Sequence, residues 1–174
     1  VVCSLLTLSI TSCEKDLLEK EQYQKEIYLI GAYNRVWTTE VSYSNEEVKT
    51  YFTVSSSGTL ALDRDVNVKM KINEELVDIY NKKYWTVLNE DKYYKSLDTD
   101  LYSIPSLENT VIKHAEGISA EVPVLIKTAS LKIDQSYVIP VEIESTTGYP
   151  ISESGYKMLI LLKLKNDYSG SYQM

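Results

Sequence analysis

The chain has 174 residues and a formal net charge of −7, with 25 acidic against 18 basic side chains. This acidic balance argues against a nucleic-acid-binding protein, because such proteins need a basic surface. Its two cysteines are Cys3 and Cys13. A domain that begins after Cys13 therefore has no disulfide, no thiol nucleophile and no cysteine-based zinc site.

The chain begins with an uncharged stretch, rich in apolar residues, that ends in Ile10-Thr11-Ser12 before Cys13. Such a run is typical of a secretory signal and is too short to cross a membrane as a helix. It resembles the lipobox of bacterial lipoproteins, which implies lipidation of Cys13. Residues 1–12 are then a truncated signal peptide that starts before Val1. The alternative is that Cys13 is a small buried core residue.

The sequence becomes charged directly after Cys13, at Glu14-Lys15-Asp16. This tripeptide resembles the acidic export tag of Bacteroidetes lipoproteins, which implies the outer face of the outer membrane. We interpret residues 13–24 as the lipidated Cys13 and a charged spacer. The folded domain is expected over residues 25–166. We interpret residues 167–174 as the start of a linker or a further module.

Residue patterns predict strands along most of the domain. Segments rich in β-branched and aromatic residues predict strands at residues 26–31 and 35–43, followed by a turn at 44–46. Apolar residues that alternate with polar ones predict further strands at 48–55, 66–72, 110–113, 121–127, 137–144 and 156–165. The last of these is apolar on both faces, so we expect it at the centre of a sheet. Pro123 and Pro140 cannot donate to a ladder, which predicts an edge position or a bulge for their strands.

The periodicity changes to that of a helix at Asn73, a favourable N-cap residue. The helix is expected to end at Lys83 or Tyr84, and three residues share its buried face: Leu76, Ile79 and Tyr80. Residues 87–106 mix tyrosines with polar residues and predict turns, with one short helix near 91–96. Together these elements predict an all-β fold, an antiparallel immunoglobulin-like β-sandwich with one short inserted helix.

The order of landmarks from Asp65 onward resembles a known family. The landmarks are the strand at 66–72, Leu76-Val77-Asp78-Ile79-Tyr80-Asn81, Tyr84, Leu88, Tyr93, Tyr102 and the segment 136–143. Together they resemble the N-terminal domain of unknown function of Bacteroidetes surface lipoproteins, over residues 25–166. The resemblance implies an immunoglobulin-like β-sandwich, which in some members precedes a chitinase-like endo-β-N-acetylglucosaminidase. It also implies a role beside glycan capture or processing, by association rather than by chemistry.

The acidic and histidine residues give little support for catalysis. His114 is the single histidine, which excludes multi-histidine metal sites within the chain. Asp63 and Asp65 begin a pattern that imitates a calcium loop but lacks its turn glycine. Glu142 and Glu144 lie about 6–7 Å apart on one strand face, although a solvated face predicts the same residues. We expect no catalytic residue, no metal and no cofactor.

Aromatic residues gather in the segment after the helix. Sugars stack on tyrosine and tryptophan rings, so Trp85, Tyr93 and Tyr94 are the candidate glycan-binding residues. Trp85 and Tyr94 are expected to be exposed. The alternative is that these rings pack the helix onto the sandwich, because large aromatic side chains dominate protein cores.

The sequence therefore predicts a non-catalytic, lipid-anchored cell-surface module that supports glycan capture or utilisation. Its expected partners are the membrane, through the N-terminal lipid, a glycan, and other outer-membrane glycan-utilisation proteins, but no nucleic acid. The alternative is a structural or adhesive, fimbrillin-like surface lipoprotein that assembles through exposed strand edges.

Overall fold

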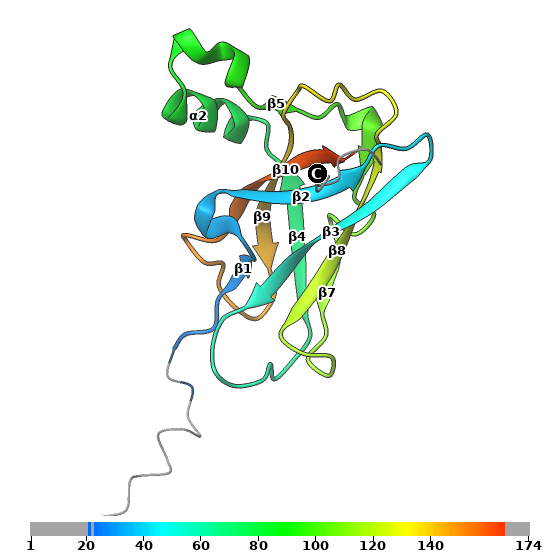
Figure 1. Cartoon of the computed structure of the whole chain (residues 1–174). Helices are drawn as coiled ribbons and strands as arrows, with labels where there is room; N and C mark the ends of the chain where they lie inside the picture. Colours follow the sequence, from blue (N-terminus) through cyan, green and yellow to red (C-terminus); the bar gives the residue numbers. More distant parts are fainter. Residues whose placement is uncertain (1–20, 22, 166–174) are drawn as a thin grey trace, which may run out of the picture.

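The computed structural model describes residue 21 and residues 23–165. Residues 1–12, Cys13 and residues 167–174, with the predictions made for them, lie outside the described residues. The described chain forms two sheets packed face to face (Figure 1). Sheet A has the order β1 (Ile27–Leu29), β3 (Glu47–Ser56), β8 (Ser119–Lys127) and β6 (Tyr102–Ser103). Sheet B has the order β2 (Val36–Ser42), β10 (Lys157–Lys165), β9 (Tyr137–Thr146), β4 (Val66–Ile72) and β7 (Thr110–Ile112), with β5 (Lys95–Ser96) beside β9.

The predicted all-β, immunoglobulin-like sandwich with one inserted helix is confirmed, with a qualification about strand direction. Most neighbouring strands are antiparallel, but β2 pairs with β10 in parallel, and so does β5 with β9. β10 follows β9 in the chain and runs antiparallel to it. β2 reaches the other edge of β10 directly from β1 of sheet A, and therefore its direction is not set by a hairpin with β10.

The core fills the space between the two sheets because each strand turns one set of alternate side chains inward. In β4, for example, Val66, Val68 and Met70 are buried, whereas the residues between them are exposed. Phe52 of β3 is 2% exposed and is the one phenylalanine of the chain. The period-two patterns of the sequence thus identify the inward faces correctly.

The two strand prolines have different environments. β8 lies between β3 and β6, so the edge prediction for this strand is wrong, but β6 pairs only with Leu125 and Ile126 and its ladder does not reach Pro123. For Pro140 the edge prediction is also wrong, because β9 lies between β10 and β4. On one side of β9, Val138 is the last residue that pairs with β5 and Val141 is the first that pairs with β4. Pro140 lies between them, so its missing N–H costs no hydrogen bond to either strand.

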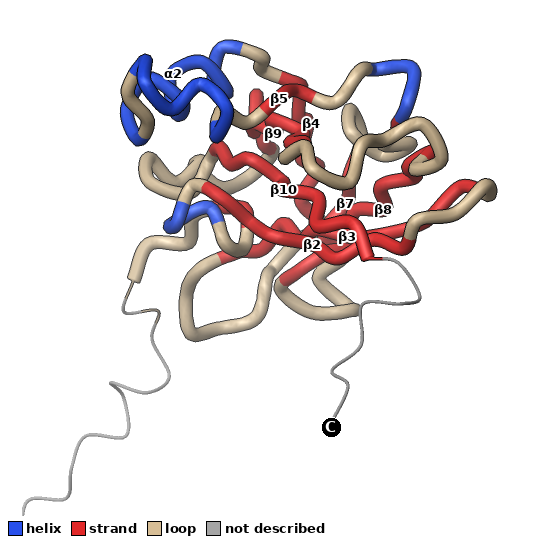
Figure 2. The backbone as a smooth tube through the Cα atoms, turned by 45° about the horizontal axis from the view of Figure 1, so that its top comes forward, coloured by secondary structure: helices blue, strands red, loops and turns tan. Residues whose placement is uncertain are grey.

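The α-helix α2 (Glu75–Tyr84) covers the outer face of sheet B, on the side of β9 and β10 that faces away from β3 (Figure 2). Beneath it lies a second, smaller apolar cluster, formed by Leu76, Val77, Val138 and Leu159. β10 is therefore covered on both faces, as predicted from its sequence. None of the helices in the described part of the chain has the length and apolar character needed to cross a membrane.

The start of the helix is as predicted, but its buried face is rotated. The side-chain oxygen of Asn73 accepts the N–H of Glu75 at 3.2 Å, which is a capping interaction. The helix buries Leu76, Val77 and Asn81, whereas Ile79 is 52% exposed. The prediction of Ile79 as a buried residue is wrong, because the side of the helix that carries Val77 and Asn81 lies against the sheet.

The segment after the helix differs from the prediction of a short helix near residues 91–96. A 3-10 helix, η2, spans Val87–Lys92, and Lys95 and Ser96 form β5. Two further 3-10 helices are η3 (Thr99–Leu101) and η1 (Ala32–Asn34). The N–H of Leu97 donates to the carbonyl of Val138 at 2.8 Å, and Leu97 is 1% exposed. Burial of Leu97 therefore draws this segment onto β9 as a strand.

Candidate functional site

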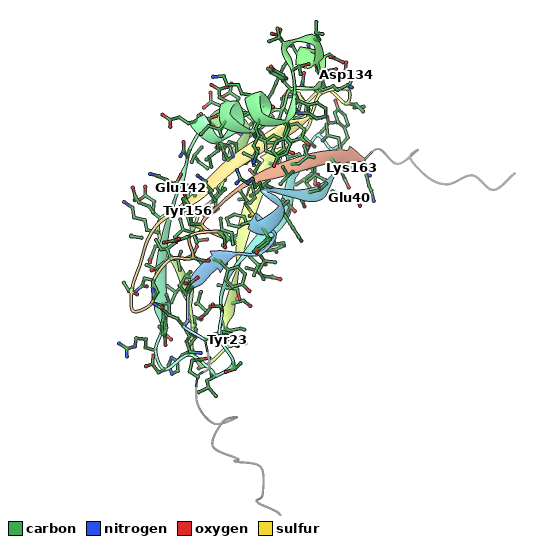
Figure 3. All side chains as sticks on the ribbon, turned by 90° about the vertical axis from the view of Figure 1, so that its left-hand side faces the viewer. Tyr23, Glu40, Asp134, Glu142, Tyr156 and Lys163 are labelled. Atoms are coloured by element: carbon green, nitrogen blue, oxygen red, sulfur yellow. The ribbon has the colours of Figure 1, made fainter. Side chains whose placement is uncertain are left out.

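A hollow of about 470 Å³ opens where α2, η1 and the beginning of β10 meet. It is lined by Ala32, Tyr33, Arg35, Leu76, Ile79, Tyr80, Lys83, Glu153, Ser154, Tyr156, Lys157, Met158 and Leu159. A second hollow of about 210 Å³ is lined by Tyr28, Leu29, Gly31, Tyr33, Ser152, Ser154 and Gly155. Tyr33 and Ser154 line both hollows, so we call the two together the Tyr33 groove. Figure 3 shows Tyr156 beside Glu142 beneath α2, which marks the β10 side of the groove.

Tyr33 is presented by a tight turn that connects the two sheets. Gly31 has φ +89°, and a Cβ at this position would lie 2.5 Å from Cε3 of Trp37. Only glycine fits there without movement of the indole ring. Ala32 is then buried at 1% exposure, while Tyr33 is 86% exposed. The turn thus holds the tyrosine ring out from the surface between the two hollows.

Arg35 closes this turn in a conformation that is uncommon for an arginine. Its φ is +62°, and among the described residues it is the one non-glycine residue with positive φ. The N–H of Arg35 donates to the carbonyl of Ala32, and its own carbonyl accepts the N–H of Leu159, both at 2.8 Å. The turn is therefore fixed to β10 by main-chain hydrogen bonds.

The floor of the larger hollow is apolar, and phenol groups lie above it. Leu76, Met158 and Leu159 are buried, whereas Ile79 faces the opening. Burial raises the pKa of Tyr80, and the nearby Tyr94 phenol adds to this increase. The Tyr80 phenol is protonated at neutral pH, as tyrosine ordinarily is, and can donate a hydrogen bond.

The rim of the groove is charged. Arg35, Lys83 and Lys157 line the larger hollow together with one carboxylate, Glu153. None of these four side chains forms an ion pair within residues 21 and 23–165. The ammonium of Lys157 instead lies 4.8 Å from the centre of the Tyr156 ring. An apolar floor with exposed aromatic, phenolic and charged groups above it suits a polar organic ligand.

The aromatic residues predicted as glycan contacts lie beyond the C-terminal end of α2. Trp85, Tyr93 and Tyr94 are all half-buried, so the expectation that Trp85 and Tyr94 are exposed is wrong. The ring of Tyr94 stacks on Tyr80 at 5.2 Å between centres, and Asn81 binds its main chain. The position of Tyr94 is therefore explained by its packing against α2, which was the alternative interpretation. That these three residues bind a glycan stays a prediction.

The histidine and the acidic pair of β9 lie in surface hydrogen bonds and ion pairs. Nδ1 of His114 lies 2.6 Å from Oδ1 of Asp65. The imidazole of His114, followed by the main-chain N–H of the same residue, lowers the pKa of Asp65. Glu144 pairs with Lys69 at 2.7 Å, and Glu142 accepts a hydrogen bond from Asn73. The His114 ring makes one hydrogen bond, to Asp65. The solvated face expected for β9 is present only in part, because Glu144 is exposed whereas Glu142 is half-buried and Val138 on the same face is buried beneath α2.

The aspartates of the calcium-like pattern are also engaged. Asp63 pairs with Arg64 and accepts a hydrogen bond from the Tyr149 hydroxyl, and both contacts hold its pKa below the usual range. Within the described part of the chain, no group of three or more histidine, cysteine or acidic side chains is arranged to hold a metal ion.

Sequence reasoning missed the residues that build the groove. Tyr33, Arg35 and Tyr156 come from two strand connections and were not singled out, because nothing local indicates that these connections meet under α2. The one local signal is Gly31-Ala32-Tyr33 between two predicted strands, since a glycine before an aromatic residue in a short connection indicates a turn that displays the ring.

A comparison with protein families matches most of the chain. A family model described as an N-terminal domain matches residues 23–150. The chain belongs to this family. The resemblance to an N-terminal domain that was drawn from the sequence is thereby confirmed.

Solved structures from Bacteroides have the same fold. A protein of unknown function from Bacteroides ovatus is 20% identical, with a TM-score of 0.70, over 86% of this chain and 49% of that one. An auxiliary nutrient binding protein from Bacteroides thetaiotaomicron is 16% identical, with a TM-score of 0.63, over 80% of this chain and 47% of that one. EndoBT-3987 of the same species, solved with a Man5GlcNAc product, is 21% identical, with a TM-score of 0.57, over 85% of this chain and 34% of that one.

At these identities the likeness establishes the fold alone. The chain spans about half of the length of the first two structures and about a third of EndoBT-3987. A comparison with curated proteins finds no match.

Proposed function

We propose that the chain is a non-catalytic cell-surface module, held at the outer membrane through a lipid on Cys13, that supports glycan capture or utilisation. The observation that carries this proposal is the Tyr33 groove, where a tyrosine that is 86% exposed stands between two hollows. A sugar ring can place its C–H face on such an aromatic ring, and its hydroxyl groups can bond to the phenols and Ser154 at the rim. The main-chain hydrogen bonds of the turn fix the place from which the ring projects.

The comparisons support a role beside glycans without assigning one to this chain. One structure of the same fold belongs to an auxiliary nutrient binding protein, and another to EndoBT-3987 with a Man5GlcNAc product. An N-terminal domain that accompanies such proteins can bring a polysaccharide close to a neighbouring module. The partners we propose are a glycan, the membrane and other outer-membrane proteins of glycan utilisation.

Binding is tested with the full chain on a glycan array. We expect binding to at least one class of oligosaccharide, and we expect Tyr33→Ala to abolish it. The matched control is Tyr51→Ala, which removes an exposed tyrosine from β3 of the other sheet. Unchanged binding by Tyr33→Ala, with loss in Trp85→Ala, would move the site to the loop aromatics Trp85, Tyr93 and Tyr94.

The lipid anchor is a separate part of the proposal and has its own test. It is supported by the uncharged run that ends in Ile10-Thr11-Ser12-Cys13 and by the charged residues directly after it. Metabolic labelling with palmitate should label the protein in cells that express it from its natural start. Cys13→Ala should remain unlabelled and leave the outer-membrane fraction. Labelling that persists in Cys13→Ala would contradict the assignment of Cys13.

The alternative function is a structural or adhesive surface subunit. It is favoured by β2, a seven-residue strand at one edge of sheet B that could pair with a strand of another chain. Sedimentation of the purified chain at increasing concentration separates the two functions. Growing oligomers together with no binding on the array would favour the structural subunit.

A further inference from the structure

The Tyr33 groove has a local charge opposite to that of the whole protein. The chain carries a net charge of −7, yet Arg35, Lys83 and Lys157 line the larger hollow with Glu153 as the one carboxylate of its lining. A positive patch of this kind raises the local concentration of an anionic ligand.

Arg35, Lys83 and Lys157 form no ion pair within the described residues, whereas several basic residues elsewhere on this surface do. Lys69 pairs with Glu144 at 2.7 Å, and Lys113 pairs with Glu116 at 2.8 Å. Lys157 has an acidic neighbour across the strand, Glu142, but that carboxylate accepts a hydrogen bond from Asn73 at 2.5 Å and lies 3.7 Å from Lys71. The ammonium of Lys157 forms no ion pair within the described residues and lies over the ring of Tyr156, which also lines the groove.

The backbone at Arg35 gives an independent reason to assign a role to its side chain. A φ of +62° is unfavourable for arginine and is adopted freely by glycine. Glycine would thus suit the turn better than arginine does, and the arginine places its side chain here at a cost in backbone strain. Residues held in such conformations gather at ligand sites.

We propose that the Tyr33 groove binds acidic saccharides, with a carboxylate or sulfate group of the sugar held by Arg35. The planar fork of the guanidinium bonds two oxygens of either group at once, while Lys83 and Lys157 add positive charge. The sugar ring lies on Tyr33, and Glu153 and Ser154 accept and donate hydrogen bonds at its hydroxyl groups. This inference rests on the proposed function, because it names the class of glycan that the same groove takes.

The test compares acidic and neutral forms of one sugar on the full chain by calorimetry. The probes are an oligogalacturonate, its methyl ester, and a sulfated oligosaccharide of similar length. We expect the oligogalacturonate or the sulfated probe to bind at least about tenfold more tightly than the neutral ester, with affinity that falls as salt rises. Which of the two acidic probes binds more tightly distinguishes a carboxylate site from a sulfate site.

Two substitutions that remove one positive charge make the test specific. Arg35→Gly relieves the backbone conformation, so it should fold, and it should weaken binding of the acidic probe by about tenfold or more. Lys49→Gln removes a charge from β3 of the other sheet and should leave binding unchanged. A thermal unfolding transition at or above that of the natural chain confirms that Arg35→Gly is folded.

The outcomes separate this inference from the proposed function. Equal affinity for acid and ester, both lost in Tyr33→Ala, overturns the acidic preference and keeps a glycan site. Equal weakening by Arg35→Gly and Lys49→Gln overturns it as well, since the attraction is then unspecific. Full competition by inorganic sulfate at the concentration of the sugar makes the groove an anion site and overturns it. If no oligosaccharide binds, the proposed function fails too.

Discussion

The side-chain amide of Asn81 binds both main-chain polar groups of Tyr94. Its Nδ2 donates to the carbonyl of Tyr94, and its Oδ1 accepts the N–H of Tyr94, each at 2.9 Å. Asn81 is 5% exposed, so these two bonds are shielded from water. They fasten the end of α2 to the segment that leads into β5. They also hold the Tyr94 ring against Tyr80, which lines the Tyr33 groove.

Replacing Asn81 should therefore destabilise the fold more than a polar surface substitution does. We expect Asn81→Ala to lower the free energy of unfolding by about 2 kcal/mol, because two main-chain groups lose their partners in a buried place. Urea denaturation measures this difference. Asn45→Ala, in the exposed turn before β3, is the control and should stay within about 0.5 kcal/mol. An equally small change for Asn81→Ala would mean that water replaces the amide at Tyr94.

Gly31 provides a second test, of the turn that presents Tyr33. Gly31→Ala should cost about 3 kcal/mol, because the new methyl group meets the Trp37 ring at 2.5 Å and φ is +89°. Gly117→Ala has an even less favourable φ of +134° but meets nothing within 4 Å, so it should cost only about 1–2 kcal/mol. Thermal unfolding of both variants shows how much of the loss in stability at Gly31 comes from the contact with the Trp37 ring. If Gly117→Ala is the more damaging of the two, the Trp37 ring yields easily and does not fix the turn.

The elements predicted correctly from the sequence are those that local patterns specify. Val66 to Ile72 alternates so regularly that the strand and its inward face follow from the pleat alone, and β4 has the same bounds. Asn73 is recognisable as a cap because a side-chain oxygen at that place satisfies a free main-chain N–H of the helix. Such features need no knowledge of distant parts of the chain.

The features that the sequence did not reveal depend on distant partners. Leu97 lies in a polar, tyrosine-rich segment, and its burial against β9 makes β5 a strand where a short helix was expected. The groove is likewise made by η1, α2 and the connection before β10, which are far apart in the sequence. A periodicity read within one segment carries no information about which connections meet.

The orientation of α2 can be tested with two neighbouring residues. Val77 is 5% exposed, whereas Ile79, which was expected to be buried, is 52% exposed and lines the groove. We expect Val77→Ala to lower the free energy of unfolding by about 2 kcal/mol through lost burial and a small cavity. Ile79→Ala should change it by less than about 0.5 kcal/mol, since it also improves helix propensity. The reverse order in urea denaturation would favour the face predicted from the sequence.

A final prediction concerns Glu21, which fastens the segment before β1 to the loop after β3. Its carboxylate accepts the N–H and the hydroxyl of Thr59, at 2.8 and 3.0 Å, and the N–H of Leu60 at 3.3 Å. It also pairs with Lys25. Lys25 first, and then Thr59, lower the pKa of Glu21 from 4.5 to about 2. The folded chain thus binds this proton less tightly than the unfolded chain does.

The stabilisation from Glu21 is consequently present in full above pH 4.5 and is lost as the pH falls towards 2. Glu21→Gln should lower the urea midpoint at pH 7, and the difference from the natural chain should shrink steadily between pH 4.5 and pH 2.5. Glu46→Gln, in the exposed turn before β3, serves as the control and should leave the midpoint unchanged at pH 7. A difference for Glu21→Gln that is the same at every pH would show that hydrogen-bond geometry, rather than the negative charge, holds this segment to the sandwich.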